Sequence, residues 1–595
     1  MAEAVRRGAA LRRLGRAWPL LPALAFLGVF FLYPVVDFLL LSFTPPRGGG
    51  FTLAAYSRVL EGAGYMRVMG ITFKISLMVT VLSVVLGYPV AYLLAAVDQK
   101  TRARLIILVL IPFWTSFLVR TFALMILLAH EGPVQGLVRA VGLGDAGFKP
   151  IFSMTGVMIG TTQALMPLAI LVMMSAMLNI DRDLLKAAST MGARRGQAFF
   201  RIFLPLSLPG VTAAALLTFI TSLGFFITPA LLGSPRESMI AQVILTQIQE
   251  LLNWRLAGAL SLVLLACALV VFAIYDRVLN PPERFRDADP HVPASDVGRA
   301  VAAIGRAMAA IPGWACDRLA EAVERVRPPR ADRAPRDGGG LALRIVAGAI
   351  ILFLVGPAFV VIPVSFTAGA FIALPPEGFS LRWYEAYLGS RVWMNATALS
   401  FAVGLLAALL TTLLGAAAAF VLTRQALVGR RALLALFISP LIVPRIVTAV
   451  ALFYLFARLE LVGSITGLVI GHTVLALPFV VVTVMAVLKS YDVRYDQAAS
   501  TLGANPYRTL RHVTLPLLKS GIISAFLFAF VTSFDELTIA LFISAGTVTT
   551  LPKAMWSDLI LQMNPTLAAV STVILVIATA IVLVAEAFQR RAVKA

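Results

Sequence analysis

The amino-acid sequence predicts an all-α integral membrane protein made of two homologous six-helix units, with about twelve transmembrane helices in all. Three observations lead to this fold class: an apolar composition, a series of long apolar segments, and an internal repeat. Of the 595 residues, 60% are hydrophobic and 13% are charged, whereas soluble globular chains are about half apolar and about a quarter charged. The composition therefore excludes a soluble enzyme and also excludes a disordered, collagen-like or coiled-coil chain.

Twelve apolar segments are long enough to cross a membrane, because a transmembrane helix needs about 20 mostly apolar residues. The sequence has no long alternating pattern of the kind that indicates a β-barrel. In the first half, the predicted spans are 19–42, 71–97, 105–129, 151–178, 211–232 and 256–276. In the second half, they are 342–366, 395–422, 432–457, 465–488, 521–543 and 566–588.

The distribution of basic residues predicts the direction of the spans. The net charge is +21, and the basic residues fall mainly between the apolar segments. In the first half, 13 Lys and Arg lie on the side of the N-terminus and 7 lie on the opposite side; in the second half the numbers are 11 and 4. Because cytoplasmic loops carry an excess of Lys and Arg, we expect both chain ends in the cytoplasm. The positive charge then reflects contact with the lipid bilayer, and no nucleic-acid partner is expected.

A segment of different composition separates the two halves. Residues 277–340 are rich in Pro and Gly and carry charges of both signs, which is typical of a linker. We therefore expect a first transmembrane unit at 1–276, a cytoplasmic linker at 277–340 that could hold a short helix near 297–326, and a second transmembrane unit at 341–595. The chain has two cysteines and four histidines, so we expect neither a disulfide scaffold nor a metal site.

The two halves are related by an internal repeat. Residues 160–272 align with residues 471–583 at a constant offset of 311, and the best-matched stretch pairs 187–193 with 498–504. Farther upstream, an offset of 328 pairs Gly87 with Gly415 and Pro112 with Pro440. The repeat predicts two units in the same orientation, related by an axis along the membrane normal, with a shared pathway at their interface.

The best-matched stretch lies between the fourth and fifth spans of each half, on the side that carries the basic residues. Asp181 and Asp492 are candidate N-caps for a short Ala-rich helix, whose small side chains would allow another surface to approach closely. Gly192 and Gly503 can adopt a positive φ and end that helix. A second short segment then leads to a Leu-Pro pair before span five. Each copy is therefore expected to form a helix–turn–helix along the cytoplasmic face.

This doubled motif resembles the cytoplasmic signature of the permease subunits of binding-protein-dependent ABC importers: Glu-Ala-Ala, three residues, Gly, about nine residues, then an apolar residue, a variable residue and Leu-Pro. Lys186 and Gln497 stand in place of the leading Glu. The resemblance implies that each copy is a coupling helix docked in a groove of an ATPase subunit. The residues to which it gives this role are Lys186, Ala187, Ala188, Gly192, Leu204 and Pro205 in the first copy, and Gln497, Ala498, Ala499, Gly503, Leu515 and Pro516 in the second.

The ATPase is expected to be a separate chain. A P-loop needs a Gly-Lys step to hold phosphates, and none of the eight lysines follows a glycine. The chain is therefore predicted not to be an enzyme and to hold no cofactor, with ATP-Mg bound by the partner ATPase. The resemblance implies two copies of the ATPase subunit inside the cell and an extracytoplasmic solute-binding protein outside.

The resemblance extends to a substrate class. Each half is most similar to one of the two permeases of spermidine/putrescine importers, through residues 226–233 in the first half and 533–537 in the second. A polyamine is the first expectation, and permeases for ferric iron, sulfate, opines or aminophosphonates are the alternatives. An ion-gradient-driven secondary transporter of twelve spans is an alternative of another class.

Asp535 and Glu536 lie within the predicted fifth span of the second half, where an ionised carboxylate is unfavourable unless it faces water or a partner. Either the two acids line the pathway and favour a cation, or they pair with a basic group such as Arg445 or Lys74 and hold helices together. Other polar residues within the predicted spans could either line the path or form hydrogen bonds between helices; they are Gln163, His472, Asp37, Arg120 and Arg445.

Overall fold

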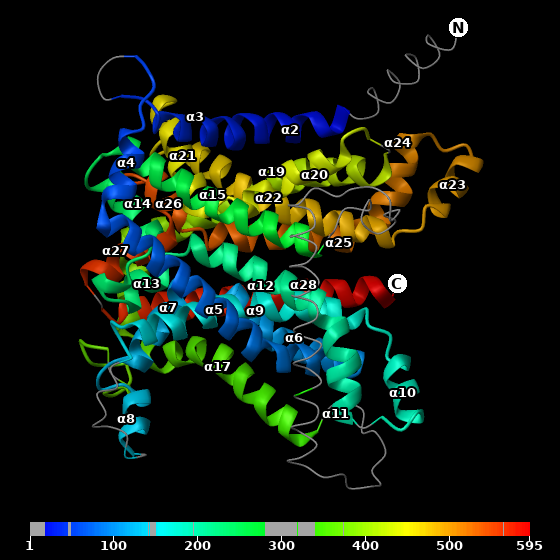
Figure 1. Ribbon diagram of the computed structural model, residues 1–595, viewed down its shortest axis with the longest axis horizontal. Helices are drawn as coiled ribbons and strands as arrows, with labels where there is room; N and C mark the ends of the chain where they lie inside the picture. The colour runs from blue at the N-terminus through cyan, green and yellow to red at the C-terminus, as the bar shows by residue number, and fades with distance from the viewer. Residues whose placement is uncertain are drawn as a thin grey trace.

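In the computed structural model, all the named secondary-structure elements of the described residues are helices, as the sequence predicts (Figure 1). It describes residues 18–45, 49–140, 142, 150–193, 195–279, 318, 340–372, 374–425, 427–562 and 564–594. Of the predicted linker at 277–340, the structure describes residues 277–279, 318 and 340, so the short helix expected near 297–326 lies outside the described residues apart from residue 318.

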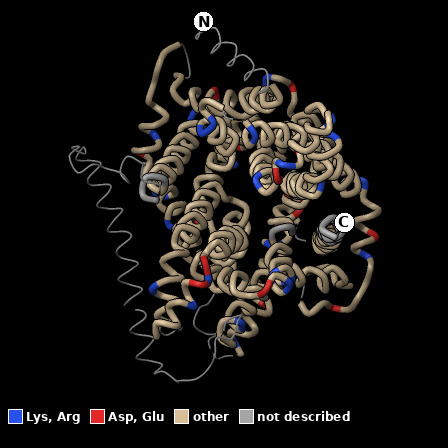
Figure 2. The backbone as a smooth tube through the Cα atoms, turned by 90° about the vertical axis from the view of Figure 1, so that its right-hand side faces the viewer, with Lys and Arg blue, Asp and Glu red and all other residues tan. Residues whose placement is uncertain are grey.

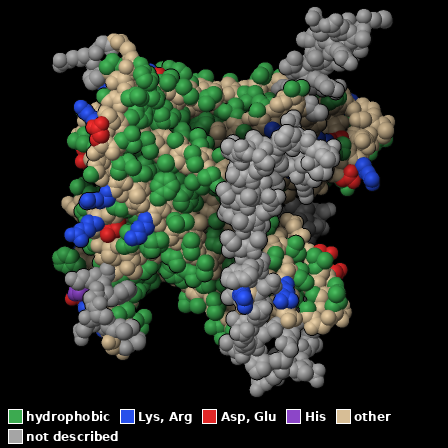
Figure 3. Space-filling view, viewed as in Figure 1, with side chains coloured by type: hydrophobic (Ala, Val, Ile, Leu, Met, Phe, Trp, Pro, Cys, Tyr) green, Lys and Arg blue, Asp and Glu red, His purple; other side chains and the backbone are tan. Residues whose placement is uncertain are grey.

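Within the described residues, ten helices are long and apolar enough to cross a membrane, and a bent helix pair raises this number to eleven. The twelfth predicted span corresponds to α28, whose apolar part Thr566–Ala580 is shorter. The space-filling view shows a broad hydrophobic surface with charged side chains toward its two ends (Figure 3). This arrangement suits a protein surrounded by lipid along its middle.

The first half runs from α2 to α15. Its first span is α2 and α3 joined by a π-helical turn, and the helices are α2 (Leu21–Leu27), α3 (Tyr33–Leu41), α4 (Ala54–Glu61), α5 (Ala63–Ala96), α6 (Gln99–Trp114), α7 (Phe117–Leu128), α8 (Pro133–Ala140), α9 (Met154–Leu178), α10 (Asp183–Thr190), α11 (Arg195–Ala198), α12 (Leu204–Leu223), α13 (Ile227–Leu232), α14 (Ile240–Gln249) and α15 (Trp254–Leu279).

The second half repeats this order. Its helices are α17 (Leu341–Ser365), α18 (Arg382–Gly389), α19 (Arg391–Arg424), α20 (Arg430–Ile442), α21 (Arg445–Arg458), α22 (Ile465–Ser490), α23 (Arg494–Thr501), α24 (Pro506–Thr509), α25 (Leu515–Phe534), α26 (Thr538–Ile543), α27 (Leu551–Leu561) and α28 (Thr566–Lys594).

The third span of each half is broken, which differs from the single helices predicted at 105–129 and 432–457. In the first half, α6 ends at Trp114 and α7 begins at Phe117 after Ser116, whose hydroxyl accepts a hydrogen bond from the Leu118 N–H. In the second half, α20 and α21 meet at 96°. Pro112 and Pro444 lie close to these breaks, and proline removes a backbone donor that a continuous helix would use.

The fifth spans begin and end earlier in the chain than predicted, at Gly196–Leu223 and Pro506–Phe534. The segments 211–232 and 521–543 were expected to be continuous, but α12 ends at Leu223 and α25 ends at Phe534, and a short helix follows each after a gap of three residues. Asp535 and Glu536 therefore lie in a helix break rather than inside a helix. Backbone N–H groups freed at such a break are available to carboxylates, which explains why two acids are accommodated there.

Each unit has a matched three-helix core. Helices α5, α9 and α12 pack together in the first half, and α19, α22 and α25 pack together in the second. A Cβ at Gly87 would lie 3.0 Å from Ile170 Cγ1, and a Cβ at Gly415 would lie 2.7 Å from Val480 Cγ1. Both paired glycines therefore mark a close approach of the second and fourth spans.

The outward faces of the two cores match as well. On α5 and α19, exposed aliphatic side chains recur every four residues at positions related by the offset of 328. Side chains at this spacing share one face of a helix, and this face is the one expected to meet lipid. These residues are Leu77, Val81 and Val85 on α5, and Leu405, Leu409 and Leu413 on α19.

The first span of each unit packs against the other unit. Helix α17 of the second half lies against α5, α6 and α7 of the first half, while α3 and α2 of the first half lie against α21 and α19 (Figure 1). The Gln163 amide on α9 also donates to the Leu354 carbonyl on α17 at 2.9 Å. The two units are therefore interlocked, which the sequence repeat alone does not predict.

Candidate functional site

Two matched loops project from one end of the molecule. Helices α10 and α11 connect α9 to α12, and helices α23 and α24 connect α22 to α25; both pairs lie at the right-hand end of Figure 1. Figure 2, turned to face this end, shows that most of the chain behind them is uncharged. The first loop is residues 181–205 and the second loop is residues 492–516.

The local conformation of the loops follows from their sequence. Gly192 and Gly503 have φ angles of 85° and 83°, which confirms the predicted positive φ at the end of each Ala-rich helix. The Asp181 carboxylate accepts from the Asp183 N–H and the Asp492 carboxylate accepts from the Arg494 N–H, each at 2.9 Å. The sequence predicts these aspartates as the N-caps, but Arg182 and Val493, one residue later, occupy the N-cap positions. The two bonds still satisfy one backbone N–H at each helix start.

The residues of the signature divide between buried and exposed positions. Ala188 and Ala499 are buried against the rest of the protein, whereas the preceding pairs are exposed: Lys186 and Ala187 in the first loop, Gln497 and Ala498 in the second. The Lys186 ammonium pairs with Asp183 at 2.8 Å on the surface. The Leu-Pro pairs Leu204-Pro205 and Leu515-Pro516 are the first two residues of α12 and α25, the position at which proline is compatible with a helix.

Sequence reasoning missed the most exposed apolar side chains of the loops. Met191 and Leu502 occupy equivalent positions, each directly before the positive-φ glycine, and they are 87% and 88% exposed. The alignment itself held the signal, because both copies keep a large apolar residue at a tip that is otherwise polar and small. Both side chains are therefore available to pack against another protein.

Between the two halves lies a cavity of about 170 Å³. The first half contributes residues of α7, α9, α12 and α13 to its wall, and the second half contributes residues of α20, α21, α22, α25 and α26. Most of the wall is apolar, and its charged members include Asp535, Glu536 and Arg445. The interface at which the repeat predicts a shared pathway therefore contains a space with polar groups.

The Asp535 carboxylate reaches across to the first half. It accepts a hydrogen bond from the Phe117 N–H, at the start of α7, at 3.3 Å, and it interacts with the Ser116 hydroxyl and electrostatically with Arg120. Arg120 is buried, and its guanidinium carbon lies 4.6 Å from the centre of the Phe117 ring. The N-terminus of α7 and the Arg120 guanidinium both supply positive charge to the Asp535 carboxylate.

Glu536 has partners within its own half. Its carboxylate lies 3.6 Å from the Arg445 guanidinium and accepts from the Ile539 N–H at 3.0 Å. Glu536 is almost fully buried, whereas the Arg445 side chain is 40% exposed and lines the cavity. Of the two acids that the sequence singled out, Glu536 therefore lies next to an arginine, and Asp535 lies at a helix N-terminus and interacts electrostatically with Arg120.

Gln163, His472 and Asp37 make hydrogen bonds between helices. Gln163 bonds to α17, as described above, and the His472 Nδ1 lies 2.8 Å from the Ser533 hydroxyl. Asp37 pairs with Arg458 of the other half at 2.8 Å. Among the described residues, the cavity wall includes neither Gln163 nor His472, and no group of three or more His, Cys, Asp or Glu side chains is arranged to hold a metal ion.

Two six-helix repeats that share a central cavity and carry paired loops at one end define the permease class of membrane transport proteins. The chain belongs to the family described as binding-protein-dependent transport system inner membrane component, whose model matches residues 83–281 and again residues 412–594. The two matches confirm that the permease domain is present twice, once in each half.

Characterised relatives match the halves separately. The spermidine/putrescine transport system permease protein PotB of Salmonella typhimurium is 33% identical over 233 residues, which cover 39% of this chain and 81% of PotB. PotC of Escherichia coli (strain K12) is 28% identical over 242 residues, which cover 41% of this chain and 91% of PotC. A chain of the crystal structure of a bacterial alginate ABC transporter in complex with an alginate pentasaccharide-bound periplasmic protein is 18% identical, with a TM-score of 0.39, and the match covers 47% of this chain and 96% of that chain.

Proposed function

We propose that this chain is the membrane-spanning component of an ATP-driven importer of polyamines such as spermidine or putrescine, with both permease subunits fused in one polypeptide. The observation that carries the proposal is that the two halves are similar to two different spermidine/putrescine permeases, PotB and PotC. Membership in the binding-protein-dependent permease family favours this function over an ion-gradient-driven secondary transporter.

The energy for transport comes from separate ATPase subunits in this proposal. Two copies bind at the cytoplasmic end, one at each loop, with Met191 and Leu502 inserted in their surface. The ATPase subunits hold ATP-Mg, since the permease sequence contains no Gly-Lys step. Closure of the ATPase pair moves the two loops and thereby swings the two halves between inward-open and outward-open states.

The orientation follows from the basic residues. The permease lies in the inner membrane of the cell in this proposal. Both termini and both loops are cytoplasmic, because they lie on the side with more Lys and Arg. The opposite face receives the solute-binding protein, which delivers the substrate to the interface between the halves. The lipid bilayer surrounds the aliphatic faces of α5 and α19.

The cavity has groups that suit a polyamine. Asp535 and Glu536 supply two carboxylates to its wall, and each is paired at present with an arginine or a helix N-terminus. A polyamine carries several ammonium groups, which can take over these contacts as the halves move apart. The acids then bind the cation during passage, and the arginines restore neutrality after its release.

One observation favours a second candidate, a permease for an anion such as sulfate, an opine or an aminophosphonate. The Arg445 side chain is 40% exposed, against 2% for its partner Glu536. A guanidinium that faces a cavity is a good ligand for sulfate or phosphonate oxygens. Ferric iron, the remaining alternative, would also depend on the acids.

Uptake by proteoliposomes separates these candidates. The proteoliposomes contain the full chain, its ATPase subunits and its binding protein. Uptake of spermidine, putrescine, ferric iron and sulfate is measured. We expect ATP-dependent polyamine uptake that falls at least tenfold when Asp535→Asn and Glu536→Gln are combined. The control is Asp37→Asn, which breaks the ion pair between Asp37 and Arg458 away from the cavity wall and should leave uptake unchanged. Unchanged polyamine uptake in the double variant removes the acids from the pathway. Sulfate uptake that is lost in Arg445→Gln supports the second candidate instead.

A further inference from the structure

The two loops are attached to their own halves by different chemistry. In the first half, the attachment includes an apolar and aromatic cluster. The Tyr92 ring on α5 meets the rings of Phe199 and Phe203 edge to face, at centroid distances of 5.2 and 4.9 Å, and Ile180 and Leu185 pack against the same cluster. Such contacts depend on buried apolar area and on ring geometry.

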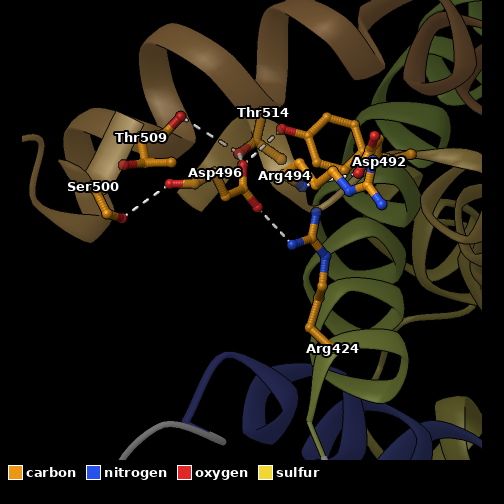
Figure 4. Close-up of polar contacts among 8 residues, drawn as sticks. Arg424, Asp492, Arg494, Asp496, Ser500, Thr509 and Thr514 are labelled. Carbon is orange, nitrogen blue, oxygen red and sulfur yellow. Dashed lines mark hydrogen bonds and ion pairs between the residues drawn. The ribbon is translucent and has the colours of Figure 1, made fainter. Parts of the chain in front are cut away.

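In the second half, the attachment is a polar cluster centred on Asp496 of α23 (Figure 4). The Tyr491 and Thr514 hydroxyls donate to Asp496 Oδ1 at 2.6 and 2.9 Å. The Arg424 guanidinium, at the end of α19, donates to Oδ2 at 2.5 Å. Two elements of the second loop and the end of a long membrane helix thus meet on one carboxylate.

The contrast is position for position. At the offset of 311, Asp496 corresponds to Leu185, Tyr491 corresponds to Ile180 and Thr514 corresponds to Phe203. Three apolar residues in or directly before the first loop are therefore replaced by three hydrogen-bonding residues in or directly before the second loop. The acid that the signature would place at position 497 is absent, and a carboxylate stands one residue earlier, where α23 directs it toward α19.

An arginine also joins each loop to the end of the second span of its half, but the element that donates the hydrogen bond differs between the halves. In the first half, Arg182 of the loop donates to the Ala96 carbonyl at 3.1 Å and to the Ala95 carbonyl, at the end of α5. In the second half, the arginine belongs to α19 and the acceptor belongs to the loop. Ala96 and Arg424 are equivalent at the offset of 328. The contact between the loop and the second span therefore lies at the same place in both halves, with the loop as donor in the first half and as acceptor in the second.

The Asp496 cluster is partly buried rather than on an open surface. The side chains of Arg424 and Asp496 are 17% and 19% exposed, so solvent screens their attraction less than it would on an open surface. The guanidinium of Arg424 lies over the Tyr491 ring at 4.9 Å, and its Nε and Nη2 atoms are buried without a hydrogen-bond partner among the described residues. Loss of the carboxylate would leave a buried cation without its counter-charge.

We propose that Asp496 is a positioning residue that fixes the second loop to the end of α19, so that motion received at Leu502 is passed to the second half through a charged junction. The first loop passes motion received at Met191 through the apolar cluster around Tyr92. The proposal rests on the proposed docking of ATPase subunits at the two loops. It makes the two halves of the importer unequal in how they respond to a single substitution.

The test uses spin labels on the full chain in lipid nanodiscs. Cys267→Ser and Cys316→Ser remove the native thiols, and a label is attached through Met191→Cys or Leu502→Cys. We expect Asp496→Asn to shorten the rotational correlation time of the label at 502 at least twofold and to leave the label at 191 unchanged. The matched control is Asp183→Asn, which removes an exposed acid of the first loop and should change neither label.

Rescue variants keep the test informative. Asp496→Glu should retain most of the immobilisation at 502, and Arg424→Asp combined with Asp496→Arg should restore part of it. The label at 191 reports on whether the rest of the chain is folded in each variant. The proposal is overturned if Asp496→Asn leaves the label at 502 unchanged, or if it mobilises both labels equally.

A second arm includes the ATPase subunit and the complete importer. Asp496→Asn should lower the number of substrate molecules imported per ATP hydrolysed, while Asp183→Asn should not. Unchanged import per ATP in Asp496→Asn contradicts the positioning role. If the ATPase subunit immobilises neither label in the parent chain, the docking proposal fails, but the effect of Asp496→Asn on the isolated chain still stands or falls by itself.

Discussion

Shortening the side chain at the tip of one loop should weaken ATPase binding without destabilising the permease. Met191 and Leu502 are 87% and 88% exposed, so Met191→Ala or Leu502→Ala removes almost no contact within the chain. Full burial of a Met or Leu side chain in a partner surface is worth about 1.5–3 kcal/mol. Each substitution should therefore raise the dissociation constant at its own loop by about 10- to 100-fold.

The measurement is a binding titration of the ATPase subunit against the full chain in nanodiscs, together with thermal unfolding of each variant. Leu251→Ala is the matched control, because Leu251 is also exposed but lies between α14 and α15 at the other end of the fold. We expect unfolding temperatures equal to that of the parent chain and weaker binding only in the loop variants. Dissociation constants within twofold of the parent value would refute the reasoning that these tips enter the ATPase.

Three further predictions concern the chain itself. Gly415→Ala should destabilise the second half by about 1–3 kcal/mol in detergent unfolding, because the added Cβ would lie 2.7 Å from Val480. The control is Gly348→Ala, where the added Cβ would have no neighbour within 4 Å and should not destabilise the protein. Equal effects of the two substitutions would contradict the close packing at Gly415. Arg458→Gln should change stability by about 1 kcal/mol or less, because the pair with Asp37 is partly exposed, and a larger loss would show that the pair is more than a surface contact. The pKa of Asp496 is raised by burial but is lowered overall by the hydrogen bonds from Tyr491, Arg424 and Thr514. A carboxyl group with a depressed pKa stabilises the folded state at pH values above its unfolded-state pKa, and this stabilisation is lost as the pH falls through its folded-state pKa. The label at 502 should therefore stay immobile from pH 8 to about pH 5 and become mobile only below about pH 4, the ordinary pKa of an aspartate. Mobility near neutral pH would contradict the assignment.

The spans, the repeat and the loops could be predicted because each depends on local composition. An apolar segment of about 20 residues and a Gly at a helix end carry their meaning in the sequence itself. The pairing of Gly87 with Gly415 could be predicted for the same reason, since both copies preserve the close approach of two helices.

The breaks in the third and fifth spans could not be predicted with the same ease. Proline and glycine are tolerated inside membrane helices, so Pro112 and Gly224 did not by themselves mark an end. Whether the helix continues depends on partners from elsewhere in the fold, such as the Asp535 carboxylate that accepts from the Phe117 N–H.

The exchange of the first spans between the halves, and the cluster at Asp496, depend on contacts between residues far apart in the chain. Arg424 and Asp496 are separated by 72 residues, and nothing in either local sequence names the other. The repeat held a usable signal nevertheless, because the replacement of Leu185 by Asp496 and of Phe203 by Thr514 occurs within otherwise matched segments.

Thiol labelling from each side of the membrane tests the docking of ATPase subunits on the two loops most directly. In oriented vesicles with Met191→Cys or Leu502→Cys in the chain without native thiols, a membrane-impermeant maleimide should react only from the cytoplasmic side. ATPase subunit added at a concentration that saturates even the weakened loop should protect both positions. Reaction from the outer side, or equal reaction with and without the ATPase subunit, would contradict the account.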